Sequence, residues 1–252
     1  MMEQQNYQYQ DHSVFVRERS VSKKFFANVF TWMFVALAIS TACAYFLSAN
    51  IELLQYLTKV NIETGRATLN IYGWIVMLSP LFIFLAMSYG LYKLSYATLV
   101  LLFTVYAALF GVSLSFILMQ YTGVSIISCL AAAVAIFAVM AFMGYTTDVD
   151  LSRFRSILMA GIIGMIVVSI VNIFIGSETI YYILGYIGVA IFTALTAYQI
   201  QEIKRIGEGL DEYGNEIAMV DSKKLALIAA LSLYITFINL FLSLLRIFGD
   251  RR

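Results

Sequence analysis

Charged residues are scarce in this sequence of 252 residues, and their scarcity excludes most classes of soluble protein. They make up 12% of the chain, against about a quarter in soluble domains. So few charges cannot cover the surface of a soluble body of this size, and a disordered chain would be far less apolar. The net charge of +1 gives no electrostatic reason to expect nucleic-acid binding.

Cysteine, histidine and proline are almost absent as well. The two cysteines, Cys43 and Cys129, are too few for a disulfide scaffold and lie in apolar stretches typical of buried thiols. One histidine, His12, provides neither an H-E-x-x-H zinc motif nor a ligand pair for haem. We therefore expect no metal site, no cofactor and no enzymatic activity. The single proline, Pro80, lies inside an apolar run, where it should kink a helix and free one backbone carbonyl.

Long uncharged runs are what the sequence has in abundance. Apolar residues reach 62% of the chain and the mean hydropathy is +0.86. The uncharged runs are 25–51, 67–92, 94–147, 156–177, 179–201 and 225–245. Because a membrane helix needs about 20 apolar residues, five runs hold one span each, and 94–147 holds two that break near 120–123. The sequence predicts an all-α polytopic membrane bundle of seven helices in a lipid bilayer.

The ends of the runs suggest a simple domain organisation. We expect a polar, cytoplasmic N-terminal tail over 1–24, one transmembrane domain over 25–249 and a short C-terminal tail over 250–252. Ser22, Ser152 and Ser222 are candidate N-caps of the first, fifth and seventh spans. Gly111 and Ser115 form a small-x3-small pair, and Ala131, Ala135 and Ala138 should line one packing face of the fourth span.

The distribution of Lys and Arg predicts the orientation. With the N-terminus inside, eleven of the sixteen Lys and Arg residues lie on the inner side. Arg246, Arg251 and Arg252 would then lie outside. A re-entrant last helix would bring these three residues inside as well, so the sequence leaves the side of the C-terminus open. We expect the N-terminus to be cytoplasmic.

The seven predicted spans contain no Asp, Glu, Lys, Arg or His, so polar chemistry inside the membrane rests on neutral groups. In the last span Ser232, Thr236, Asn239 and Ser243 recur on one helical face, and Thr196 is polar in the span before it. Two interpretations remain open. These side chains either form hydrogen bonds between helices or line a polar pathway between the sixth and seventh spans.

Three stretches of these helices resemble the Bax inhibitor-1 family of membrane proteins. GYTTDVDLSRF at 144–154 is similar to the family's G-x-T-x-x-D-L-S segment, although Asp148 and Asp150 in it do not fit a calcium loop and are explained by helix capping. IFTALTAYQIQEIK at 191–204 is similar to the sixth-helix motif T-A-Y-D-x-Q-x-I-K. LSLYITFINLFLSLLRIFG at 231–249 is similar to the seventh-helix pattern L-Y-L-D-F-I-N-L-F, and LFTVYAALFGVSLSFI at 102–117 shows weaker similarity.

The resemblance, to the family's bacterial members in particular, implies a seven-helix bundle in which six helices surround the last, placed in a bacterial inner membrane. Family members include pH-sensitive calcium leaks, and members are linked to cytoprotection and to a membrane-anchored AAA protease. The resemblance also implies a pH sensor formed by two aspartates, one in the sixth helix and one in the seventh. In some members an arginine in the second helix pairs with these aspartates. Two close carboxylates share a proton, so one of them titrates near neutral pH.

The sequence departs from the family at all three of these positions. Gln199 replaces the sixth-helix aspartate, Thr236 replaces the seventh-helix aspartate, and the second span carries no arginine. Gln199 and Thr236 can bond to each other but cannot titrate near neutral pH, and they offer calcium only neutral oxygens. We therefore expect an ion-permeable bundle for calcium or another small cation that lacks this pH switch. The alternative is a non-conducting regulator that binds another membrane protein, such as a membrane-anchored AAA protease.

Overall fold

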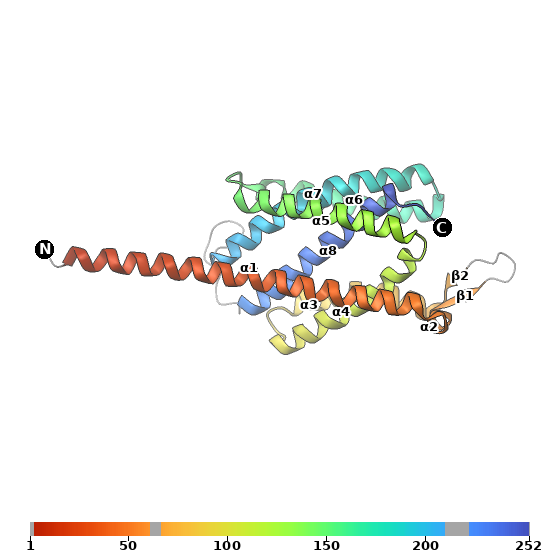
Figure 1. The fold of residues 1–252 in the computed structure, drawn as a ribbon, viewed down its shortest axis with the longest axis horizontal. Helices are drawn as coiled ribbons and strands as arrows, with labels where there is room; N and C mark the ends of the chain where they lie inside the picture. Colours follow the sequence, from red (N-terminus) through yellow and green to blue (C-terminus); the bar gives the residue numbers. More distant parts are fainter. Residues whose placement is uncertain (1–2, 61–66, 210–221, 252) are drawn as a thin grey trace.

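The protein is a bundle of seven long helices in a computed structural model that describes residues 3–60, 67–209 and 222–251 (Figure 1). The long helices are α1 (Glu3–Ala49), α3 (Ile71–Gly90), α4 (Tyr96–Leu118), α5 (Gly123–Thr146), α6 (Arg155–Ile175), α7 (Glu178–Gly207) and α8 (Ser222–Phe248). Between α1 and α3 lie a short helix, α2 (Ile51–Leu57), and two antiparallel strands, β1 (Thr58–Val60) and β2 (Ala67–Leu69). A 3-10 turn, η1 (Leu151–Phe154), precedes α6.

All seven long helices are long and apolar enough to cross a membrane, which confirms the predicted all-α membrane bundle. The run 94–147 does hold two spans, because α4 ends at Leu118 and α5 begins at Gly123. The last span is one continuous helix of 27 residues, about 40 Å long. It crosses the bundle, and its end lies opposite the beginning of α1 (Figure 1), so α8 is not re-entrant.

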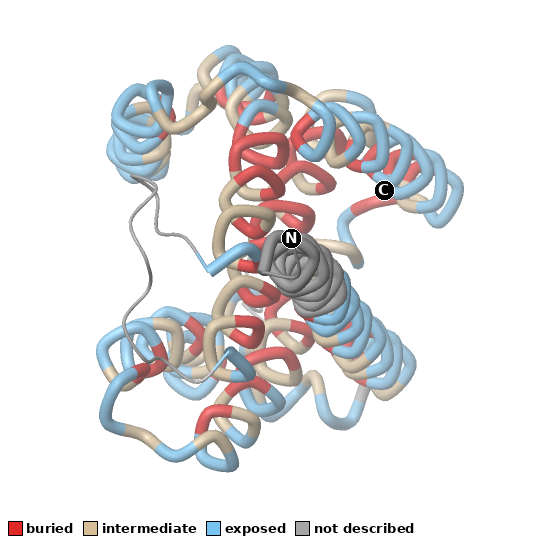
Figure 2. The backbone as a smooth tube through the Cα atoms, turned by 90° about the vertical axis from the view of Figure 1, so that its left-hand side faces the viewer, coloured by how far each residue is buried: buried red, intermediate tan, exposed pale blue. Residues whose placement is uncertain are grey.

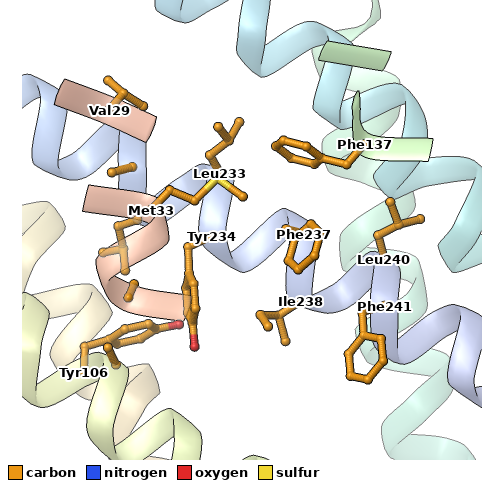
Figure 3. Packing of buried hydrophobic residues seen from close by; sticks show 14 of the residues in the cluster. Val29, Met33, Tyr106, Phe137, Leu233, Tyr234, Phe237, Ile238, Leu240 and Phe241 are labelled. Carbon is orange, nitrogen blue, oxygen red and sulfur yellow. The ribbon is translucent and has the colours of Figure 1, made fainter. Parts of the chain in front are cut away.

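Helix α8 is the centre of the bundle, as the family resemblance implies. It packs against α1, α4, α5 and α7. Its buried side chains Leu233 and Tyr234 lie beside Met33 of α1, and Phe237 lies toward α5 (Figure 3). Buried residues gather in the middle of the bundle and exposed ones on its outside (Figure 2). A helix that is apolar nearly all round is stable only inside a protein or a membrane, and α8 is surrounded mainly by protein.

Aromatic rings fix the neighbours of α8 in place. Phe137 of α5 meets Phe237 edge to face, with ring centroids 5.5 Å apart. Tyr106 and Phe110 of α4 both meet the ring of Tyr234 edge to face. Edge-to-face pairs contribute about 0.5–1.5 kcal/mol each beyond the burial of area. They therefore set the positions of α4 and α5 around α8.

Two of the three predicted N-caps are wrong. Helix α1 runs without a break from Glu3 through Ser22, so the polar segment ahead of the first span continues the helix of that span. At the fifth span the cap is Asp150, whose carboxylate accepts a hydrogen bond from the backbone N–H of Ser152. Ser222 is the first residue of α8, and the residues before it lie outside the described part of the chain.

Pro80 lies inside α3 as predicted, and the structure shows how the freed carbonyl is satisfied. The missing N–H of Pro80 leaves the carbonyl of Val76 without its usual partner. The hydroxyl of Ser79 donates to that carbonyl at 2.8 Å. The proline is therefore tolerated inside a membrane-spanning helix, because the neighbouring serine replaces the lost hydrogen bond.

Small residues bring several helices into contact, but only in part as predicted. Gly111 of α4 packs on the backbone of Ser40 in α1, as expected of a small-residue pair. The alanine prediction for α5 is wrong, because Ala131, Ala135 and Ala138 are exposed on the outside of the bundle. The packing face of α5 instead contains Ala133, which is buried, and Gly144, which packs on the backbone of Ala197 in α7.

Candidate functional site: a cavity beside the central helix

A cavity of about 910 Å³ lies between α3 and α4 on one side and α6 and α7 on the other, with α8 as its back wall. Helix α3 packs on α4, and α6 packs on α7, so the two pairs flank an opening. Met77 and Leu81 of α3 and Ile166 and Ile170 of α6 line the cavity and are also exposed, which marks the rim. Because these side chains are apolar, the opening faces the lipid.

The cavity extends over most of the depth of the bundle. Its lining along α7 runs from Leu184 to Glu202, about 27 Å of helix. The hydrocarbon core of a bilayer is about 30 Å thick. At one end, called the Arg155 end, Arg155 and Glu202 line the cavity, and at the other, called the Arg246 end, Arg246 lines it.

The polar stripe predicted on α8 faces this cavity. Ser232, Thr236, Asn239 and Ser243 all line it, with Thr236 and Ser243 buried. None of the hydrogen bonds found among the described residues links these four side chains to another helix. The pathway interpretation therefore fits the stripe better than the interhelical one. Thr196 does not belong to this lining; it is fully buried and donates to the carbonyl of Phe192 in its own helix.

Gln199 and Thr236, the positions of the family's two aspartates, both line the cavity. The expected bond between them is not formed, because the buried Oε1 atom of Gln199 has no hydrogen-bond partner within the described residues. The packing of Gly188 on Ser243 sets the antiparallel register of α7 and α8. Continuing along both helices from that contact places Gln199 level with Ser232, about one helical turn from Thr236.

Some of the donors among the cavity's polar side chains are used inside their own helices. Three of these side chains donate to the carbonyl four residues earlier: Ser113 Oγ to Leu109 O (3.1 Å), Asn239 Nδ2 to Ile235 O (2.8 Å) and Ser243 Oγ to Asn239 O (2.7 Å). The oxygens of these side chains keep their acceptor capacity, and Oε1 of Gln199 adds another unused acceptor. These oxygens can contact a cation or accept from the donor groups of a ligand.

Ionisable groups also line the cavity, and sequence reasoning missed them. Helix α7 continues to Gly207, so Glu202 lies on the transmembrane helix itself, although it ends the uncharged run in the sequence. Its carboxylate accepts a hydrogen bond from Tyr198 and interacts electrostatically with Arg155 and Arg205. The signal available in the sequence was the spacing, because Glu202 follows Gln199 by three residues and therefore shares its helical face.

The Arg246 end is closed by a cluster of aromatic and cationic side chains. Arg246 and Arg251 both lie over the ring of Tyr181, at 4.7 Å and 4.5 Å from its centroid. The hydroxyl of Tyr181 lies 2.7 Å from that of Tyr121. Burial and this hydrogen bond raise the pKa of Tyr121 to about 12. Asp250 continues the closure, since its backbone N–H donates to Ser125 Oγ at 3.0 Å.

The loop of the family-like segment holds the Arg155 end together instead of lining the cavity. Asp150 forms a salt bridge of 2.6 Å with Arg205 and accepts from Ser152 Oγ at 2.7 Å. These hydrogen bonds, chiefly that from Ser152, lower the pKa of Asp150 to about 2. Asp148 is exposed and makes no such contact within the described part of the chain. The predicted capping role is therefore correct for Asp150 alone.

Neither a metal cluster nor the arginine of the second helix is present at the cavity. Among the described residues no three or more His, Cys, Asp or Glu side chains come together. Helix α3 contributes only Met77, Pro80, Leu81 and Phe84 to the lining, all of them uncharged. Within the described parts of the chain, the carboxylate of Glu202 is the one acidic group of the lining.

Comparison with known proteins now gives this architecture a family. The sequence model described as inhibitor of apoptosis-promoting Bax1 matches residues 22–252. The chain belongs to the Bax inhibitor-1 family. It is 36% identical over 237 residues to the inner membrane protein YbhL of Escherichia coli, covering 94% of this chain and 96% of YbhL.

Two further relatives show that the similarity extends over the whole bundle. An uncharacterised protein of Borreliella burgdorferi is 37% identical over 236 residues, covering 94% of this chain and 96% of that protein. One of Rickettsia prowazekii is 34% identical over 232 residues, covering 91% of each chain. This Bax inhibitor-1 family member is therefore an integral membrane protein whose cavity carries neutral side chains at positions 199 and 236.

Proposed function

We propose that the protein is a cation-permeable membrane bundle of the leak type, with the cavity beside α8 as its pathway for calcium or another small cation. The observation that supports this function best is the polar stripe of α8, which faces a cavity that extends over most of the bundle's depth, with the unpartnered Oε1 atom of Gln199 in the same lining. Hydrophobic walls with a few placed polar groups are typical of ligand cavities of this size. No catalytic activity belongs to this proposal.

The pathway lacks the di-aspartyl pH sensor expected from the family resemblance. An amide at Gln199 and a hydroxyl at Thr236 keep the same charge at every physiological pH. Cation flux should therefore change little between about pH 8 and pH 6, where a shared proton would otherwise be released. The lining holds neutral oxygens at the positions where a carboxylate pair would attract a divalent ion.

Ion flux into liposomes across pH tests both parts of the proposal. Purified protein should carry calcium or a monovalent cation at a nearly constant rate over this pH range. The double variant Gln199→Asp, Thr236→Asp should acquire a steep pH dependence, whereas Gln120→Asp, an exposed substitution outside the cavity, should not. A steep rise of flux toward acid pH in the unaltered protein would contradict the missing sensor.

Substitutions in the cavity wall test whether ions follow this route. Asn239→Leu should lower cation flux strongly, because it removes an acceptor oxygen and leaves an apolar surface there. Ala135→Leu is the control, since Ala135 lies on the exposed outside of α5. Equal flux in both variants and in the unaltered protein would exclude the cavity as the pathway.

The alternative function is that of a non-conducting regulator of another membrane protein, such as a membrane-anchored AAA protease. The length of α1 favours it, because that helix projects beyond the other helices at its amino-terminal end (Figure 1). Deletion of residues 3–22 should then abolish capture of a membrane partner by chemical crosslinking while the bundle remains folded. Under the leak proposal the same deletion leaves ion flux unchanged.

For the membrane and the orientation we propose the bacterial inner membrane with the N-terminus in the cytoplasm. The excess of Lys and Arg on that side supports this orientation. A cysteine introduced at Lys23 should react with a membrane-impermeant thiol reagent only after cell lysis, and one introduced at Asp250 should react in intact spheroplasts. The opposite pattern would reverse the orientation.

A further inference from the structure

Glu202 and Gln199 occupy adjacent positions on the cavity-facing side of α7. Residues three apart on a helix are neighbours, with Cβ atoms about 5–6 Å apart. Both side chains line the cavity at its Arg155 end. The carboxylate therefore lies within one turn of an amide oxygen that is buried and has no partner among the described residues.

An unpartnered buried acceptor beside a carboxylate indicates a ligand. Leaving a buried polar atom without a hydrogen bond is unfavourable, so such an atom calls for a specific explanation. The two oxygen types, carboxylate and amide carbonyl, are those that hard cations bind. The positive charge found at this end belongs to Arg155, which also begins α6.

We propose that Glu202 and Gln199 form a binding site for a monovalent cation, sodium or potassium, at the Arg155 end, and that Arg155 is the resident counter-charge that the cation displaces. The inference rests on the proposed cation pathway and names the ion class that this site selects. A lone carboxylate offers one negative charge, which balances one monovalent ion. Calcium takes six to eight oxygens, commonly from several carboxylates, and among the described residues Glu202 supplies the one carboxylate of the lining.

Arg155 explains how the site stays stable without an ion. It begins α6, lines the cavity and interacts electrostatically with Glu202. A carboxylate in a largely apolar cavity is unfavourable unless it is paired. The guanidinium supplies that pairing in the empty state, and because Arg155 itself is exposed, it can turn outward when a cation arrives.

Thermal unfolding of the purified protein in detergent tests binding without requiring conduction. Sodium or potassium chloride should raise the unfolding temperature relative to N-methylglucamine chloride at the same ionic strength, since a ligand that binds only the folded state stabilises it. Glu202→Gln should abolish this shift, and Arg155→Gln should lower the apparent dissociation constant about tenfold by removing the competing charge. Glu208→Gln is the matched control, because Glu208 is exposed beyond the end of α7.

The outcomes separate this inference from the proposed pathway. An unchanged sodium or potassium shift in Glu202→Gln, weaker binding in Arg155→Gln, or stabilisation by calcium alone would each overturn the monovalent site. If Glu202→Gln does not fold, Glu202→Asp must show binding that is weakened by the shorter side chain; binding equal to that of the unaltered protein would also overturn the site. Absence of ion flux in liposomes together with a normal cation shift would overturn the pathway and leave the site in place.

Discussion

The guanidinium of Arg205, near the end of α7, lies 2.6 Å from Oδ1 of Asp150, in the loop before α6. This salt bridge joins two segments that are 55 residues apart in the sequence. Gln201 of α7 also holds the loop backbone on both sides of Asp150. Its side chain accepts a hydrogen bond from the N–H of Leu151 and donates one to the carbonyl of Val149, both at 2.8 Å. The Arg155 end of the cavity is therefore fixed by contacts from the loop that carries the family motif.

Acidification should destabilise the protein through Asp150. Its pKa is lowered from 3.8 to about 2, first by the hydrogen bond from Ser152 and then by Arg205. A depressed carboxyl pKa gives stability that is fully present above the unfolded value and is lost as the pH falls toward the folded value. The unfolding temperature should therefore drop between about pH 4 and pH 2, and Asp150→Asn should remove part of this drop. Asp148→Asn, in the same loop, should leave the drop unchanged in circular-dichroism melts.

Removal of the Gln201 side chain should destabilise the Arg155 end. Gln201→Ala leaves the carbonyl of Val149 and the N–H of Leu151 without their partners, which costs about 2 kcal/mol or more in the free energy of unfolding. Gln120→Ala, an exposed substitution, should have little effect. Chemical denaturation of both variants in detergent measures the difference, and equal stabilities would show that the loop is held by other contacts.

The contact between α5 and α7 should not tolerate a side chain at Gly144. An added Cβ atom there would collide with the backbone carbonyl of Ala197, which cannot turn away. Gly144→Ala should therefore lower the free energy of unfolding by about 1–3 kcal/mol. Gly164→Ala provides the contrast, since nothing lies within 4 Å of that position and alanine favours a helix over glycine. A Gly144→Ala variant as stable as Gly164→Ala would contradict the close packing.

The closure at the Arg246 end should depend on the ring of Tyr181. Tyr181→Leu removes the surface on which both Arg246 and Arg251 lie, and it removes the hydroxyl contact with Tyr121. Cation–π contacts contribute about 0.5–2 kcal/mol each, so a loss of about 1–3 kcal/mol is expected in unfolding experiments. Tyr186→Leu, on the exposed side of the same helix, is the control. Limited proteolysis should also remove the C-terminal residues faster in Tyr181→Leu.

The spans could be predicted because their signals are local, whereas the central position of α8 was implied by the family resemblance alone. An uncharged run long enough to cross a bilayer is visible in any sequence, and the break between α4 and α5 lies within the 120–123 segment that the sequence indicated. The polar stripe of α8 could be found from its spacing alone. The alanines of α5 show the limit of this reasoning, because in lipid a face of small residues has the same composition whether or not another helix covers it.

The sequence by itself determined that this chain is a seven-helix membrane protein with a polar stripe on its last helix and neutral side chains at Gln199 and Thr236. Only the tertiary structure decided that the stripe lines a cavity, and that the Oε1 atom of Gln199 has no partner there among the described residues. The tertiary structure also placed Glu202 in that cavity, although in the sequence the charge of Glu202 marks the end of the uncharged run that predicts the sixth span. The physical reason is that hydropathy reports which residues lipid tolerates, whereas the packing of α3, α4, α6 and α7 around α8 decides which polar atoms face open space.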